Sequence, residues 1–423
     1  MSLATLLRMR RYLICGALAG AALVFTLATG PQALAAAPIR IGVLAPAAHI
    51  DGKAIFNAAK LAASEMNAAG GIDGRQVKIF TYDDKFSASD AARAFQRAVT
   101  QDHVVAMVGI FTSEVALAME PWAARLKTPL IITGAATPKL EENVHANYNR
   151  YKYVFHGFTN SIVLAREACL ATRDTVVDQL GYKKAVIFSE NADWTKAVDA
   201  EYKKCIPQMG MKLVKTINFS PSTNDFTPLY NEIESSGAHI IMAAIAHVGV
   251  KPVVQWHQQQ VPALFAGLNG QAGASEFWNA TNGATEGVID DSNEGANGVP
   301  LTPRSPEFYK AYKKKFHLSE PAYDAYTTYD AMYTLKHAIE DTHSTKADEL
   351  IKGIENVNFT GVTGRIHYYG RDNKWTHEVV HSPNPELGQS FVALQWQHGK
   401  QVVIWPKKVS EGSVVVPSFV TRK

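Results

Sequence analysis

Short apolar runs alternate with amphipathic segments along most of the chain. Residues 104–109 form one such run, residues 115–122 carry apolar side chains at helical spacing, and residues 130–132 are apolar again. Short apolar runs bounded by glycine and hydroxyl residues are typical of buried strands. The pattern therefore predicts a strand–helix–strand unit. The turns after its two strands hold Thr112, Ser113, Thr133 and Thr137, at the sheet edge where open α/β sheets bind ligands.

The same alternation continues on both sides of this unit. Further strands are expected at residues 39–44, 77–82, 184–189, 212–219, 239–244 and 263–266. Helices are expected at residues 54–68, 88–101, 162–180, 195–209, 225–235 and 248–259. Repeated βα units specify parallel sheets covered by helices, and the pattern restarts after about residue 160. We therefore expect an α/β fold with two similar lobes.

The last third of the chain no longer alternates regularly between predicted strands and helices. Helices are expected at residues 306–316, 323–340 and 346–354, and Tyr323, Tyr326, Tyr329 and Tyr333 recur at helical spacing, which is typical of core packing. Alternating segments at residues 365–369, 375–380, 391–397 and 401–405 predict strands joined as hairpins. Glycine clusters near residues 267–273 and 361–364 predict crossings between the lobes.

The N-terminus has the pattern of a cleavable signal peptide. Arg8, Arg10 and Arg11 precede the apolar residues 12–28, and Ala33-Leu34-Ala35 supplies an A-x-A cleavage site. We expect residues 1–35 to direct export to the periplasm, with an uncleaved anchor as the alternative. No other stretch is apolar enough to span a bilayer.

Composition and charge narrow the function. The 423 residues suit two domains, and 19% charged with 47% hydrophobic residues is an ordinary globular balance. The net charge of +3 disappears once the three leader arginines are set aside. A nucleic-acid-binding protein is expected to keep a basic surface, so nucleic acid is not an expected partner. Cys169 and Cys205 form either one disulfide or two buried thiols.

One string invites an enzymatic interpretation. His377-Glu378-Val379-Val380-His381 matches the H-E-x-x-H pattern of zinc proteases, which requires a helix. Here the string lies in a strand-like tail, where positions four apart are ~13 Å from each other, too far to share one zinc ion. No phosphate-binding loop or nucleophile elbow occurs in the sequence. We expect no enzyme, metal or cofactor; an exported metal-assisted hydrolase is the alternative.

An ordered series of motifs resembles a known family. It comprises IRIGVL at residue 39, NAAGGIDGR at residue 67, Tyr82-Asp83-Asp84, VGIFTS at residue 108, PLIITGAAT at residue 129, Ala192-Asp193-Trp194, NDFTPLYNEI at residue 224 and FTGVTGRIHY at residue 359. These motifs resemble type I periplasmic solute-binding proteins of ABC importers, of the leucine/isoleucine/valine-binding kind. The resemblance covers essentially the whole chain after the leader.

The resemblance implies an architecture and a role. It implies two Rossmann-like lobes joined by a three-strand hinge, with residues 38–157 and 271–362 in lobe 1 and residues 158–270 and 363–423 in lobe 2. The protein would be a monomer that captures a small carboxylate-bearing solute, such as an amino acid, in the cleft and delivers it to an inner-membrane ABC permease. A ligand sensor with the same fold is an alternative.

The resemblance also implies site residues. Ser113 would hold the ligand carboxylate with Phe111 beside it, although a helix cap is the competing interpretation of Ser113. The ligand ammonium would lie near Thr133, Ala136 and Thr137. Trp194 would stack on the ligand, and His247 lies near the next such turn.

One departure from the family concerns the ammonium. The family places a glutamate where this chain has Asn269. An amide cannot supply the charge that a desolvated ammonium needs. Either Asp51 or Asp193 replaces the glutamate, with Asp51 also a candidate helix cap, or the ligand is not an α-amino acid. An organic acid, an amide or a urea-like solute then becomes the alternative.

Overall fold

The first lobe is built on a parallel sheet. The computed structural model describes residues 37–293, 298–319 and 321–420, and the expected signal peptide lies outside them. The strands are β1 (Ile39–Ala45), β2 (Val77–Asp83), β3 (Ala106–Gly109), β4 (Leu130–Ile132) and β5 (Val154–His156), in the order β2-β1-β3-β4-β5. All neighbours are parallel. The order reverses between β1 and β3, which makes that point a site for ligands.

The second lobe repeats this arrangement. Its strands are β6 (Lys184–Glu190), β7 (Lys212–Phe219), β8 (Ile240–Ile245) and β9 (Leu264–Asn269), in the parallel order β7-β6-β8-β9. An antiparallel sheet follows beside β9, made of β10 (Ile289–Asn293), β13 (Val392–Gln397) and β14 (Lys400–Trp405). A short pair joins β11 (Phe359–Thr360) to β12 (Arg365–Ile366). Together the two parallel sheets confirm the α/β fold.

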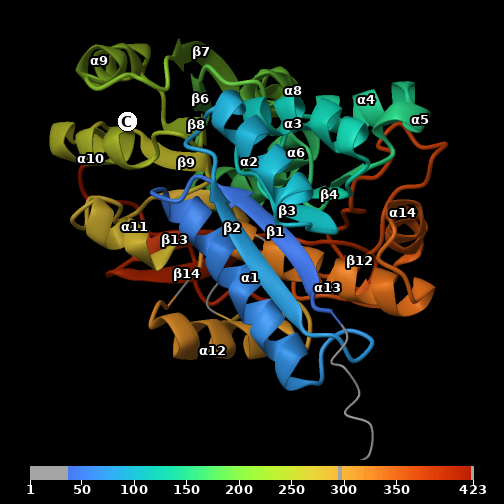
Figure 1. The fold of residues 1–423 in the computed structure, drawn as a ribbon. Helices are drawn as coiled ribbons and strands as arrows, with labels where there is room; N and C mark the ends of the chain where they lie inside the picture. The colour runs from blue at the N-terminus through green and yellow to red at the C-terminus, as the bar shows by residue number, and fades with distance from the viewer. Residues whose placement is uncertain (1–36, 294–297, 320, 421–423) are drawn as a thin grey trace, which may run out of the picture. The chain divides into compact units, whose positions relative to one another are not determined.

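Helices cover both faces of each parallel sheet (Figure 1). In the first lobe α1 (Ile50–Ala68) buries an alanine-rich face and packs on α13 (Tyr323–Thr342), because small side chains allow close approach. The other first-lobe helices are α2 (Ala88–Thr100), α3 (Ser113–Leu126), α4 (Lys139–Ala146), α5 (Tyr148–Tyr151), α12 (Ser305–Phe316) and α14 (Ala347–Asn356).

The second lobe has its own helices. They are α6 (Ser161–Thr172), which continues through the π-helical turn Arg173–Val177 into α7 (Asp178–Leu180), then α8 (Thr195–Gln208), α9 (Thr227–Ser236), α10 (Val250–Gln259) and α11 (Ser275–Ala280). A disulfide joins Cys169 of α6 to Cys205 of α8, which decides between the two alternatives for these cysteines. No helix among the described residues is long and apolar enough to cross a membrane.

The tail differs from its expected hairpins. The strand expected at residues 375–380 is absent, and the one expected at residues 365–369 is reduced to two residues. Residues 371–377 form turns, and His377 has a left-handed backbone with φ of 66°. The backbone then pairs with β5 instead: His156 N donates to His377 O at 2.8 Å, and Val379 N donates to His156 O at 2.8 Å. The exposed edge of β5 therefore outcompetes a local hairpin.

The exact lobe boundaries stay a prediction. β10, from the segment expected in lobe 1, pairs with β13 and lies beside β9 of the second lobe. Tyr368, from the segment expected in lobe 2, packs edge-on against Phe155 of β5.

Candidate ligand-binding site

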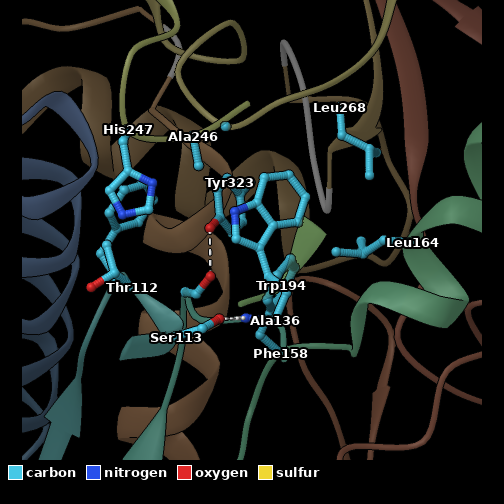
Figure 2. Close-up of a pocket in the computed structure, with 13 residues that line it drawn as sticks. Thr112, Ser113, Ala136, Phe158, Leu164, Trp194, Ala246, His247, Leu268 and Tyr323 are labelled. Atoms are coloured by element: carbon cyan, nitrogen blue, oxygen red, sulfur yellow. Dashed lines mark hydrogen bonds between the residues drawn. The ribbon is translucent and has the colours of Figure 1, made fainter. Parts of the chain in front are cut away.

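One pocket is lined by residues of both lobes. The first lobe contributes Phe111, Thr112, Ser113, Gly134, Ala136 and, from α13, Tyr323. Phe158 comes from the segment between β5 and α6. From the second lobe come Leu164, Trp194, Ala246, His247, Leu268 and Gly270. Most of them follow the carboxyl end of a strand, as expected for open α/β sheets. In Figure 2 Ser113 and Ala136 lie below, His247 and Ala246 above, and the Trp194 ring between them.

The first-lobe side of the pocket is the start of α3. Gly109 ends β3 with φ of 114°, where a Cβ would stand 2.5 Å from Leu44 O, so only glycine fits this close approach to β1. Thr112 is the N-cap of α3, but its side chain caps nothing. Ser113 Oγ instead accepts from Ala136 N at 3.3 Å and from Thr137 N at 3.2 Å. The expected cap is therefore wrong: no side chain caps this helix.

An uncapped helix start has a chemical consequence. The amides of the first turn have no partner within the helix, and the helix dipole adds partial positive charge there. Ser113 is 1% exposed, and because its oxygen already accepts two hydrogen bonds, its hydroxyl proton is directed elsewhere. Backbone amides and a hydroxyl proton together suit an anionic group such as a carboxylate.

On the second-lobe side one buried carboxylate orients two lining residues. Glu190, the last residue of β6, is fully buried. Its carboxylate accepts from Trp194 Nε1 at 3.2 Å, from His247 N at 3.0 Å and from His247 Nδ1 at 2.6 Å. Trp194 and His247 are thereby fixed at the point where the strand order of the second sheet reverses, between β6 and β8.

The charge of His247 follows from these neighbours. Burial by itself lowers the pKa of this imidazole, but the hydrogen bond to Glu190 and the nearby charges of Glu114 and Asp51 outweigh it and raise the pKa above the ordinary 6.5. Nδ1 is engaged by Glu190, so Nε2 is the nitrogen that faces the cleft, with Glu114 Oε2 3.9 Å away. These carboxylates favour the protonated imidazole and at the same time offset its charge.

The remaining walls are apolar and close together. Phe158, Leu164 and Leu268 line the pocket, and Tyr323 packs against Phe158 with ring centroids 4.8 Å apart. The cavity between these walls has a volume of about 40 Å³.

Five of the nine predicted site residues line this pocket: Phe111, Ser113, Ala136, Trp194 and His247. Thr133 bonds Thr328 Oγ1 at 2.7 Å, and Thr137 contributes its backbone to Ser113. Their side chains do not line the pocket, and neither do those of the remaining two predicted residues. Asn269 Oδ1 accepts from Gln271 N, and Asp51 pairs with His49 Nδ1 at 2.9 Å.

Sequence reasoning missed the apolar lining. Phe158, Leu164 and Leu268 have the same type and spacing as core residues, and no local signal distinguishes them. Tyr323 was expected to pack in the core, but its hydroxyl donates to Gly134 O at 2.7 Å within the pocket. Position after a strand could have indicated Ala246 and Gly270, which follow β8 and β9.

A buried cluster near the pocket has the residue types of a metal site. Ligand atoms of Glu141, His156 and Glu378 lie within 4.8 Å of one another. His156 is already hydrogen-bonded through both nitrogens, to Glu141 and to Ala135 O. Glu378 accepts from Thr159 Oγ1 and from the backbone and side chain of Asn160. Protein donors therefore satisfy most of this cluster without a cation.

The H-E-x-x-H string also lacks the geometry of a zinc protease. It lies in turns and isolated bridges rather than on a helix. His377 Nε2 bonds Glu355 Oε1 at 2.9 Å, whereas His381 Nε2 lies 3.2 Å from Glu167 Oε1. The two histidines are engaged by different partners, so the alternative of a metal-assisted hydrolase has no support in this geometry.

Two wound α/β lobes share this pocket at the ends of their strands. A profile of the periplasmic binding protein family matches residues 38–381, and the chain belongs to that family. The chain is 22% identical over 363 residues to the Leu/Ile/Val-binding protein homolog 7 of Brucella suis, which covers 85% of this chain and 88% of that protein. The resemblance stated from the sequence is thus confirmed.

Solved structures agree on the fold. The branched-chain amino acid substrate-binding protein LivJ of Streptococcus pneumoniae, in complex with isoleucine, has a TM-score of 0.72 at 22% identity and covers 87% of this chain and all of that one. A solute-binding protein of an ABC transporter from R. palustris, in complex with benzoate, also has a TM-score of 0.72. It is 17% identical, and the match covers 90% of this chain and 99% of that one. Both proteins are named as substrate- or solute-binding proteins, and membership of the periplasmic binding protein family implies export.

Proposed function

We propose that this protein is the periplasmic substrate-binding component of an ABC importer. It captures a small carboxylate-bearing solute between its lobes and delivers it, as a monomer, to an inner-membrane permease. The observation that carries the proposal is the uncapped start of α3, where Thr112 and Ser113 line a pocket shared by both lobes. The solved complexes with isoleucine and with benzoate support it, since both ligands bear a carboxylate.

The proposed mechanism assigns a task to each lobe. The first-turn amides of α3 and the Ser113 hydroxyl hold the carboxylate, and Trp194 and His247 of the second lobe then cover the ligand. Closure removes water from the carboxylate, and electrostatic attraction is stronger where water no longer screens it. A ligand that touches both lobes favours the closed arrangement by its differential affinity for the two states.

The proposal predicts the effect of Ser113→Ala on binding. Thermal-shift and tryptophan-fluorescence titrations with leucine, isoleucine, benzoate and phenylacetate should identify at least one carboxylate that binds without turnover. A hydrogen bond to a charged group contributes ~1.5–3 kcal/mol, so Ser113→Ala should weaken that ligand about 10- to 100-fold.

Ser87→Ala is the matched control. Ser87 is the N-cap of α2 and accepts from Asp90 N, but it does not line the pocket. Its removal should lower stability by ~1 kcal/mol and leave affinity unchanged. Equal affinities for wild type and Ser113→Ala, or no binding of any carboxylate, would contradict the proposed function.

A further inference from the structure

The backbone carbonyls beside the proposed carboxylate site are already engaged. A ligand with an α-amino group places its ammonium next to its carboxylate and needs hydrogen-bond acceptors for it there. The nearest loop is residues 134–136. Gly134 O accepts from Tyr323 OH at 2.7 Å, and Ala135 O accepts from His156 Nε2 at 2.5 Å. Ala136 O accepts from Ser161 N at 2.7 Å and from Ser161 Oγ at 2.6 Å.

Side chains of this loop offer no replacement. Ala136, which lines the pocket, has no hydroxyl group. The Thr133 hydroxyl is shared with Thr328 in the buried interior, at 2.7 Å. The three carbonyls of this loop are therefore each bonded to another part of the protein. Thr137 Oγ1 is buried without a hydrogen-bond partner, but Thr137 does not line the pocket.

No carboxylate lines the pocket among the residues that the structure describes. Glu190, behind the second-lobe wall, already accepts from both Trp194 and His247. Asp51 is fully buried 2.9 Å from His49 Nδ1 and does not line the pocket. Glu114, at the edge, accepts from Asp193 N at 2.7 Å. An ammonium in this pocket would lose its hydration without gaining a counter-ion, which is costly.

The groups that do line the pocket favour an anion with an apolar body. The start of α3 contributes partial positive charge on one side, and His247 lies on the second-lobe side. The space between them is walled by Phe158, Leu164, Trp194 and Leu268. Aromatic and aliphatic walls with a few convergent polar groups are typical of sites for small apolar ligands.

We infer that the ligand is an apolar monocarboxylate without an ammonium group. This inference rests on the proposed function and narrows its substrate class. Tyr323 acts as a specificity-determining residue in it, because its hydroxyl occupies the carbonyl of Gly134 that an ammonium would otherwise use.

Matched ligand pairs test this inference. Phenylacetate and phenylglycine differ only in the α-ammonium, as do 4-methylpentanoate and leucine. Calorimetric titration of the full chain should give a dissociation constant at least about tenfold lower for the acid of a pair, because the amine leaves an unpaired buried charge. Tyr323→Phe, which frees the Gly134 carbonyl, should reduce that ratio.

The outcomes separate this inference from the proposed function. If phenylglycine or leucine binds as tightly as its acid or more tightly, the inference is overturned and the proposed function stands. If none of the four ligands binds, both are overturned. If Tyr323→Phe binds its acids normally but leaves the ratio unchanged, the role of Tyr323 is wrong.

Discussion

The carboxylate of Glu190 fixes the positions of two side chains in the second lobe. It holds the indole of Trp194 and the imidazole of His247 in fixed positions, so that two unrelated side chains face the same pocket. The positions of Trp194 and His247 could be predicted from the sequence, because both follow strand ends. Glu190 could not, since it reads as the polar end of a strand, and only the fold shows that it is fully buried.

Protonation of His247 should stabilise the folded protein at low pH. Glu190, Glu114 and Asp51 raise its folded pKa above 6.5 despite burial. The contribution of His247 to folding stability is therefore fully present below the pKa that it has in the unfolded chain. This contribution is lost as pH rises through the pKa of His247 in the folded protein. The difference in thermal midpoint between wild type and His247→Gln should shrink as pH rises above about 6.5.

His239→Gln is the control of opposite sign. Burial and the nearby charge of Lys184 lower the pKa of His239. Its contribution to the stability of the folded protein should therefore become more favourable as pH rises. A wild-type minus His247→Gln difference that is flat with pH, or that grows with it, would show that His247 is not charged in the folded protein.

At the scale of elements, strands were easier to predict than the pocket. The strand at residues 130–132 is as predicted, because an apolar run between Pro129 and Thr133 permits little else. The strand predicted at residues 375–380 is wrong because pairing with β5, over 200 positions earlier, decides the conformation of this segment. The side-chain cap considered for α3 is wrong for a similar reason. Ser113 Oγ accepts hydrogen bonds from amides of the loop after β4 and not from amides of its own helix.

Contacts between elements of the two lobes should slow ligand release. Lys139 of α4 donates to Asp193 Oδ1 at 3.1 Å, across from the second lobe. Because Lys139 is half exposed, the pair contributes only ~0.2–1 kcal/mol. Lys139→Ala should raise the ligand dissociation rate by up to about fivefold in stopped-flow fluorescence, and salt should remove the difference.

Lys196 provides the comparison. It contacts the same Asp193 oxygen at 2.9 Å, but from α8 within the second lobe. Lys196→Ala should therefore leave the dissociation rate unchanged. A similar rate increase in both variants would mean that the charge of Asp193, and not a contact between lobes, determines release.

At the scale of the whole molecule, the pocket exists only where two separately wound sheets meet. The amphipathic pattern predicts both sheets, because each αβ unit buries its own apolar face. It cannot predict which apolar side chains of one lobe face those of the other, since that depends on the crossings after β5 and β9. Several residues that follow strand ends, such as Ser113 and Trp194, were therefore predictable, and Glu190 and the apolar residues that shape the cavity were not.

A crystal structure of the full chain with phenylacetate would show directly whether the start of α3 holds the carboxylate. We expect carboxylate oxygens within hydrogen-bonding distance of Ser113 Oγ and the first-turn amides of α3, with the ring against Trp194. A ligand bound outside this pocket, or one with its ring at Ser113 and its carboxylate directed to the second lobe, would contradict it.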